Sequence, residues 1–168
     1  MNLGRLFVCL AVCVTAISGA FAASLPKPQD KPILTISGNI QNKNNGDTAQ
    51  FDRAGLEALG LKTVETANPW YDGKVRFEGV SIDQLMKLVG AEGKTVTAVA
   101  LNDYVTTIPL EDFKKFNVIL ALKRDGKYMA VRDKGPLFII YPYDSDPQLQ
   151  NQTYYTRSAW QVAKLIVE

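Results

Sequence analysis

The sequence contains no histidine, and its two cysteines, Cys9 and Cys13, lie close to the N-terminus. Without histidine, this chain alone cannot build a Ser-His-Asp triad, a Cys-His pair or a His/Cys zinc site. An excess of charge of one sign is also missing, since 19 Lys and Arg side chains stand against 17 Asp and Glu. Nucleic-acid-binding proteins carry a dominant positive field, so this balance argues against nucleic acid as a partner.

Residues 1–22 have the composition of a secretory signal peptide. Met1–Arg5 carries one positive charge, Leu6–Ile17 is an apolar run, and Ala20-Phe21-Ala22 is a small-residue cleavage site. A membrane-spanning helix needs about 20 apolar residues, so this run is short for one, and an uncleaved N-terminal anchor is the alternative. Cleavage would remove both cysteines. The sequence therefore predicts a periplasmic mature protein, residues 23–168, that folds without thiols or disulfides.

The mature chain has the length of one domain, at roughly 150 residues per domain, and strand patterns outnumber helical ones without alternating with them. We therefore expect a single α+β domain. Asp52, Ser81 and Pro109 are each placed to begin a short helix, and Asp125-Gly126 is typical of a hairpin turn. The segment Ala67–Gly73 is expected to be a loop. The ranges expected to form strands are 33–40, 61–66, 75–80, 95–101, 104–108, 118–122, 128–131, 137–141 and 161–167.

Polar and aromatic residues gather in segments between the expected strands, where functional residues are often found. Asn102-Asp103 interrupts an apolar, β-branched strand and is followed by Tyr104. Such a pair is commonly a turn. The alternative is a carboxylate beside an aromatic ring, suited to the N–H edge of a planar ligand such as a pterin or a guanine, because two parallel hydrogen bonds give both strength and orientation.

Trp70 follows a proline in the expected loop, so it is either a wedge packed over a sheet edge or an exposed indole that stacks on a flat heterocycle. Arg132 opens the segment Arg132–Pro136. It either forms a solvated ion pair or places its guanidinium over a ligand ring or on a ligand oxygen. Gly135-Pro136 would let backbone approach such a ligand.

Several motifs together resemble the molybdopterin-binding domain of the sulfite-oxidase family, and the resemblance covers roughly residues 33–167. The motifs agree with the family in order along the chain. They are Thr66-x-Asn68-Pro69-Trp70, Phe77-x-Gly79-Val80-Ser81-Ile82-x-x-Leu85, Ala100-Leu101-Asn102-Asp103-Tyr104, Arg132-Asp133-Lys134-Gly135-Pro136 and Ile140-Tyr141-Pro142. The resemblance implies an α+β fold with a mixed, barrel-like sheet core and short helices.

The sequence departs from this family at the position that matters for redox chemistry. In the catalytic family, a cysteine a few residues before the loop tryptophan supplies the thiolate that binds molybdenum. Here Thr66 stands at that position, and a hydroxyl is not a soft donor. This argues against a molybdenum cofactor and against an enzyme.

What remains resembles a smaller group of periplasmic pterin-binding proteins, some of which regulate membrane-bound cyclic-di-GMP enzymes. This resemblance implies a non-enzymatic ligand sensor that binds a pterin and modulates the periplasmic domain of a membrane signalling protein. Its implied pocket residues are Trp70, Asn102, Asp103, Tyr104, Arg132, Gly135 and Tyr141. Two alternatives stay open: a molybdopterin-dependent oxidoreductase or a subunit of one, and an interaction domain whose aromatic loops contact protein.

Overall fold

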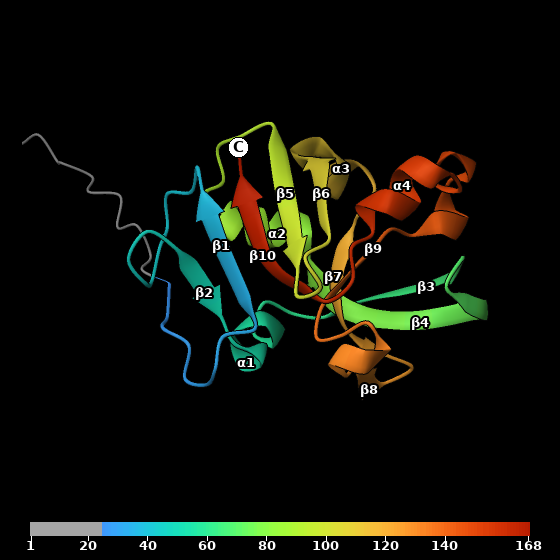
Figure 1. Cartoon of the computed structure of the whole chain (residues 1–168), viewed down its shortest axis with the longest axis horizontal. Coiled ribbons are helices and arrows are strands. Elements are labelled where there is room, and N and C mark those ends of the chain that lie inside the picture. Colours follow the sequence, from blue (N-terminus) through green and yellow to red (C-terminus); the bar gives the residue numbers. More distant parts are fainter. Residues whose placement is uncertain (1–24) are drawn as a thin grey trace, which may run out of the picture.

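The computed structural model describes residues 25–168, in which two five-stranded sheets are joined by short helices (Figure 1). The predicted signal peptide, residues 1–22, lies outside the described residues. Within residues 25–168 no helix is both long and apolar enough to cross a membrane. The content of short helices and longer strands confirms the α+β class.

The first sheet is mixed. β1 runs parallel to β10, and all other neighbours are antiparallel. In spatial order its strands are β2 (Ala49–Phe51), β1 (Leu34–Gly38), β10 (Val162–Val167), β5 (Thr95–Ala100) and β6 (Val105–Pro109). β1 ends at Gly38, whose φ is +85° and where a Cβ atom would lie 2.1 Å from the carbonyl oxygen of Val167. Only glycine fits there, and it brings the first and last strands into close contact.

The second sheet is antiparallel throughout. Its strands are β3 (Lys62–Asn68), β4 (Tyr71–Ser81), β7 (Ile119–Arg124) and β8 (Lys127–Tyr128), with β9 (Phe138–Ile140) also paired to β7. Both sheets have free ends in their strand order. The core is therefore a pair of open sheets rather than the single barrel-like sheet that the resemblance implied.

Local sequence signals account for most of the helices. The side chain of Asp52 accepts a hydrogen bond from the N–H of Gly55 at 2.7 Å, and Ser81 does the same for Gln84 at 3.3 Å, which confirms both predicted caps. The α-helices are α1 (Arg53–Glu57), α2 (Ile82–Leu88), α3 (Leu110–Lys115) and α4 (Gln152–Arg157), and the 3₁₀ turns are η1 (Val131–Asp133), η2 (Tyr143–Ser145) and η3 (Pro147–Leu149).

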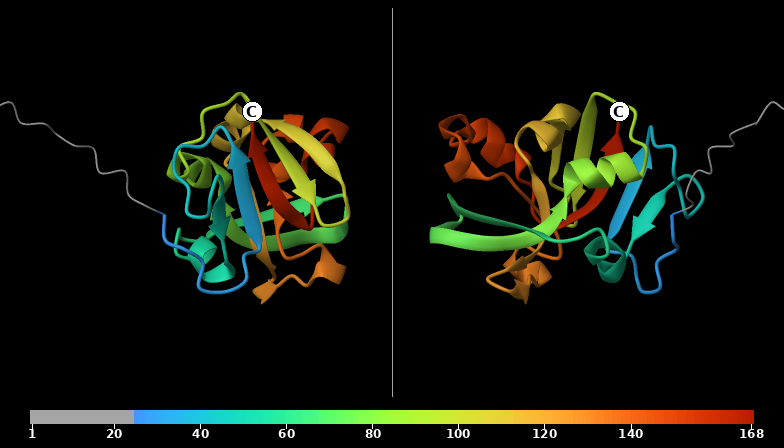
Figure 2. Two further views of the ribbon diagram at one scale, coloured as in Figure 1. Left: turned by 60° about the vertical axis from the view of Figure 1, so that its left-hand side comes forward. Right: turned by 180° about the vertical axis from the view of Figure 1, so that it is seen from behind.

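The prediction of a loop over Ala67–Gly73 is wrong, because β3 and β4 form one long hairpin whose turn is only Pro69-Trp70. The turn closes tightly because the side-chain oxygen of Asn68 accepts a hydrogen bond from the N–H of Trp70 at 3.1 Å. The hairpin reaches to the end of the molecule opposite β1 and β2 (Figure 2). Trp70, in the turn of this hairpin, packs against Phe138 of β9 and against Trp160, which precedes β10.

Buried apolar side chains form two clusters, a large one that contains both sheets and helices and a small one on the second sheet. Trp70 is half-buried and packs against both clusters. Two further aromatic side chains pack beside Trp70 at this boundary, Tyr155 against the large cluster and Trp160 against the small one.

Candidate functional site

Four aromatic side chains surround Trp70, a fifth packs on one of these four, and we call the group of six the aromatic junction. Its members are Trp70, Tyr104, Phe138, Tyr143, Tyr155 and Trp160. The rings of Phe138, Tyr143, Tyr155 and Trp160 all meet Trp70 in edge-to-face geometry, with centroids 5.2 to 6.2 Å from it. Aromatic pairs favour this arrangement. Trp70 is thus packed on several sides by aromatic side chains of its own chain. Of the two alternatives considered for it, a packed wedge or an exposed indole, this is the packed wedge.

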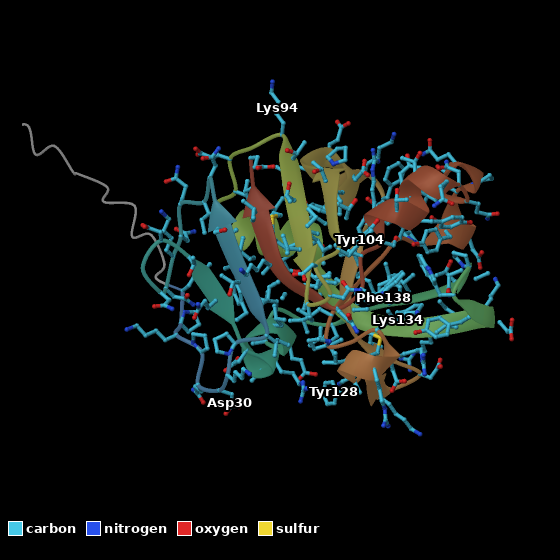
Figure 3. All side chains as sticks on the ribbon, in the orientation of Figure 1. Asp30, Lys94, Tyr104, Tyr128, Lys134 and Phe138 are labelled. Atoms are coloured by element: carbon cyan, nitrogen blue, oxygen red, sulfur yellow. The ribbon has the colours of Figure 1, made fainter. Side chains whose placement is uncertain are left out.

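Trp160, rather than Trp70, offers an indole face at the junction. The ring of Tyr104 lies parallel to it within 4°, with centroids 6.4 Å apart, and Tyr104 is 41% exposed. At that separation parallel rings are offset, and the Trp160 side chain is half-buried. The ammonium group of Lys134 lies 4.6 Å from the centroid of the Trp160 ring, within range of a cation–π interaction. Figure 3 labels Tyr104, Phe138 and Lys134 close together where the sheets meet.

The loop between β5 and β6 positions Tyr104 at the junction. Asn102 accepts a hydrogen bond from the N–H of Tyr104 at 3.2 Å, an Asx turn as expected for this residue pair. Asp103 occupies the left-handed region at φ 64°, and its side chain is exposed at the tip of the loop. The hydroxyl of Tyr104 donates to the carbonyl oxygen of Thr156 at 2.7 Å, which ties the loop to α4.

Lys134 also connects the junction to Tyr71, the first residue of β4. Its ammonium group lies 5.8 Å from the Tyr71 ring centroid, and the guanidinium of Arg124 lies 4.5 Å from the same centroid. The hydroxyl oxygen of Tyr71 is buried and has no hydrogen-bond partner among the described residues. A buried hydroxyl left without a partner is costly, so this oxygen calls for a hydrogen bond from water or from a ligand.

Arg132 and Gly135 do not take the positions that their segment suggested. The Arg132 side chain is 89% exposed and makes a loose ion pair with Asp133 at 3.7 Å, while its neighbour Lys134 supplies the cation over an aromatic ring. Gly135 is buried, and a Cβ atom there would lie 1.9 Å from the carbonyl oxygen of Met129. The close backbone approach at Gly135 is therefore to the protein itself rather than to an open surface.

Tyr141 is part of the core in this structure. It is fully buried, and its hydroxyl donates to the Asp112 carboxylate at 2.9 Å, while Arg157 donates to the same oxygen at 2.8 Å. Burial and the Asp112 carboxylate raise the pKa of the Tyr141 hydroxyl far above its ordinary value. Tyr141 therefore contributes no open surface to the junction.

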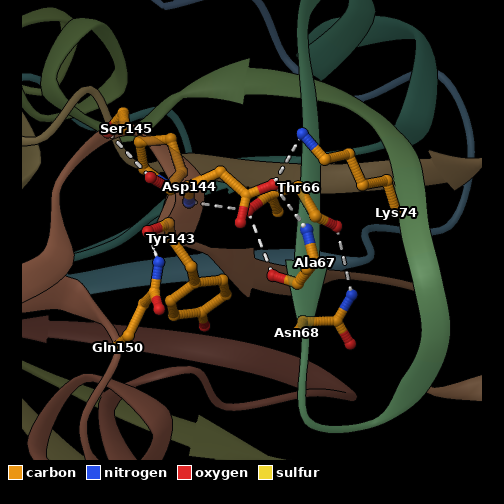
Figure 4. A network of polar contacts seen from close by, with 9 residues as sticks. Thr66, Ala67, Asn68, Lys74, Tyr143, Asp144, Ser145 and Gln150 are labelled. Atoms are coloured by element: carbon orange, nitrogen blue, oxygen red, sulfur yellow. Dashed lines mark hydrogen bonds and ion pairs between the residues drawn. The ribbon is translucent and has the colours of Figure 1, made fainter.

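Thr66, the residue at the position of the family's cysteine, is fully buried and links β3 to η2 (Figure 4). Its hydroxyl accepts a hydrogen bond from the N–H of Asp144 and donates to the carbonyl oxygen of Ala67, both at 3.1 Å. The Asp144 carboxylate accepts from the N–H of Ala67 and pairs with Lys74 at 3.2 Å, and these contacts hold the pKa of Asp144 below its usual value. The bonds of Asp144 with Thr66 and Ala67 join η2 to β3, and its ion pair with Lys74 joins η2 to β4.

No protein-family model matches the chain, and no curated protein matches it. Over residues 25–168 the structure has no group of three or more His, Cys, Asp or Glu side chains arranged to hold a metal ion. The geometry of the aromatic junction is thus the basis on which function is considered.

Sequence reasoning missed Trp160, Lys134 and Tyr71. Lys134 lies in the segment Arg132–Pro136, from which only Arg132 was selected as a candidate. Which of these two cations faces the junction depends on the direction of the backbone, and Lys134 adopts a left-handed φ of 70°. Trp160 lies two residues before β10 and forms a bridge with Phe138 of β9. A tryptophan near the start of a strand is a signal for packing against a sheet. The aromatic side chains that Trp160 contacts come from distant segments, and no sequence pattern predicts that these segments lie together.

Proposed function

We propose that the protein is a non-enzymatic, periplasmic binder of a flat nitrogen heterocycle, a pterin, which docks at the aromatic junction. The observation that carries the proposal is the half-buried Trp160 ring, with Tyr104 parallel to it and the Lys134 ammonium group 4.6 Å from its centroid. Stacking on an aromatic face contributes about 0.5–1.5 kcal/mol beyond the area that is buried.

Polar groups near this face suit the edges of a pterin. Asp103 directly precedes Tyr104, is exposed, and has no ion pair within residues 25–168. A carboxylate there would accept two parallel hydrogen bonds from the N3–H and 2-amino group of the pterin. The Lys134 ammonium is a donor for the pterin carbonyl oxygen, and the buried Tyr71 hydroxyl is a further group in need of a partner.

The surroundings of Thr66 support a binding role rather than molybdenum chemistry. A molybdenum site of the family's kind needs a thiolate, and the Thr66 hydroxyl is a hard donor that is buried and already hydrogen-bonded to Asp144 and Ala67. The residues present at this position do not fit the metal, so no redox step is assigned to the protein.

The proposed signalling role requires a partner that distinguishes the bound from the empty protein. Three large apolar side chains next to the junction, Leu101, Val105 and Val131, are each more than half exposed. Gln161 connects their two loops, because its carbonyl oxygen accepts from the N–H of Leu101 and its side chain donates to the carbonyl oxygen of Val131. A periplasmic domain of a membrane cyclic-di-GMP enzyme that docks on these residues would contact the same loops as the ligand.

The direct test is isothermal titration of the mature protein with tetrahydropterins and with their oxidised forms. A ligand present at 100 times its dissociation constant should stabilise the protein by about 2.7 kcal/mol, which a thermal shift would also reveal. The absence of both heat and thermal shift across the panel would remove the proposal.

Variants locate the site. Trp160→Leu should weaken pterin binding about tenfold or more, equivalent to about 1.4 kcal/mol. Asp103→Asn should reduce the preference for a pterin over the matching lumazine, which has a carbonyl where the pterin has its amino group. Tyr128→Leu is the matched control, because Tyr128 is also exposed and also has cations over its ring but lies on β8. Equal losses in Trp160→Leu and Tyr128→Leu would contradict the assignment.

A further inference from the structure

The first described residues cross one end of the molecule as a strap, which we define as Leu25–Asp30. One carboxylate and one amide hold it. Asp52 accepts hydrogen bonds from the N–H groups of Gln29 and Asp30 at 2.8 and 2.9 Å, and Asn44 donates to the carbonyl oxygen of Pro26 at 2.7 Å. The strap pairs with no strand of either sheet. Asp30 marks its end in Figure 3, at the lower left of the molecule and well away from Tyr104.

A cavity of about 330 Å³ lies between the strap, β2 and α1. This volume is within the range of small-molecule sites in proteins, which begins at roughly 300 Å³. Most of its lining is apolar. The apolar lining residues are Leu25, Pro26, Pro28, Phe51, Ala54, Ala58, Leu59 and Leu88.

The polar groups in the lining are few and select for an anion. Lys27, Gln29 and Gln50 belong to the lining; Lys27 and Gln29 are exposed and Gln50 is half-buried, and their side chains make no hydrogen bond or ion pair with other described residues. Asp52, the one carboxylate in the lining, already accepts from three backbone N–H groups, those of Gln29, Asp30 and Gly55. The lining thus combines an apolar body with one unpaired cation and two unpaired amides, which is the composition of a site that orients a ligand by a few polar contacts.

We propose that this cavity binds a small amphipathic carboxylic acid, such as a medium-chain fatty acid, with its alkyl chain among the apolar side chains and its carboxylate at Lys27, Gln29 and Gln50. The inference is independent of pterin binding, since the two sites share no residue. The cavity is too small for a folded segment of a partner protein. A neutral apolar molecule would gain no contact from the Lys27 ammonium or the two amides, whereas a carboxylate can bind all three.

The test uses the mature protein with decanoate and decanol as probes, below their aggregation concentrations. Isothermal titration should show decanoate binding at one site, and amide shifts in an NMR titration should cluster on the strap and on α1. Decanol should bind more weakly. Shifts that appear instead at Trp160 and Tyr104, or the absence of saturable binding, would overturn the proposal.

Two pairs of variants separate the alkyl chain from the carboxylate. Ala58 is exposed, so Ala58→Trp fills the cavity without disturbing the core and should weaken decanoate at least tenfold, whereas Ala67→Trp on β3, also an exposed alanine, should not. Lys27→Gln should weaken decanoate about two- to fivefold and leave decanol unchanged, with Lys31→Gln as the neighbouring control. Unchanged decanoate affinity in Ala58→Trp refutes the site, and unchanged affinity in Lys27→Gln refutes the orientation of the carboxylate.

Discussion

The aromatic junction and the strap cavity are built in different ways. The junction collects side chains from the β3–β4 turn, the β5–β6 loop, β9, η2, α4 and the start of β10, so it exists only when both sheets are formed. The cavity involves mainly the strap and the β2–α1 segment, which are separated in sequence by β1 and the turn after it, with Leu88 added from α2. We conclude that the junction depends on global stability, whereas the cavity wall can loosen locally without unfolding of the sheets.

The largest expected effect comes from Gly135→Ala. A Cβ atom 1.9 Å from the Met129 carbonyl oxygen forces the backbone apart, so we expect a loss of about 3 kcal/mol in the free energy of unfolding. Gly126→Ala is the control, since it has a positive φ but open space, and about 1 kcal/mol is expected from the backbone alone. Urea unfolding measures both. A stable Gly135→Ala protein that loses only ligand affinity would assign Gly135 to the ligand after all.

A crossed experiment sharpens the comparison between the two sites. Trp160→Leu should weaken pterin binding about tenfold and leave decanoate binding as it is, and Ala58→Trp should do the reverse, because the sites share no side chain. Both ligands are titrated against both variants by calorimetry. If either variant weakens both ligands equally, the two regions are coupled and the comparison fails.

Tyr141→Phe should cost about 1 kcal/mol in the free energy of unfolding and leave pterin affinity unchanged. The substitution removes the hydroxyl that donates to Asp112, while Arg157 still pairs with that carboxylate. Chemical denaturation and pterin titration of the same preparation decide the point. A loss of pterin affinity without a loss of stability would show that Tyr141 belongs to the ligand site, as the resemblance implied.

The smallest expected effect is a pH dependence of the strap. Hydrogen bonds from the N–H of Asp30, then from Gly55 and Gln29, hold the pKa of Asp52 below its usual value. This stabilisation is complete above the unfolded-state pKa of about 3.9 and is lost as the pH falls through the lower folded-state pKa. The difference in stability between the wild type and Asp52→Asn should therefore be constant near neutrality and shrink at acidic pH.

Urea unfolding of both proteins from pH 7 to pH 2.5 measures this difference. Glu57 and Asp144, whose pKa values are also lowered, titrate in both proteins and cancel. A difference between the two proteins that does not change with pH would show that the Asp52 charge does not hold the strap.

Local chemistry in the sequence predicts much of the fold. The caps at Asp52 and Ser81 and the turn at Asp125-Gly126 were recognised because each depends on residues a few positions apart. The β3–β4 turn was missed because Pro69 and Asn68 favour a loop as much as a tight turn, and only the long pairing of the two strands decides between them. Local sequence patterns do not predict which distant strands pair with each other.

The candidate site was predicted only in part for the same reason. Tyr104 and Trp70 were named and do lie at the junction, because loop aromatics flanked by turn residues stand out in a sequence. Trp160 and Lys134 were not named, since their roles come from the contacts of β9 and β10 with the preceding loop. Tyr141 and Gly135 lie in motifs of the resembled family, yet burial gives both a packing role here.

The position of β10 has a consequence for how the chain acquires its structure. This strand consists of Val162–Val167 near the C-terminus, yet it lies in the middle of the first sheet, between β1 and β5. β1 pairs with β2 on one side and with β10 on the other, so the second pairing cannot form before β10 has been synthesised. The first sheet is therefore completed only after β10 has been synthesised, whereas the second sheet does not include this strand.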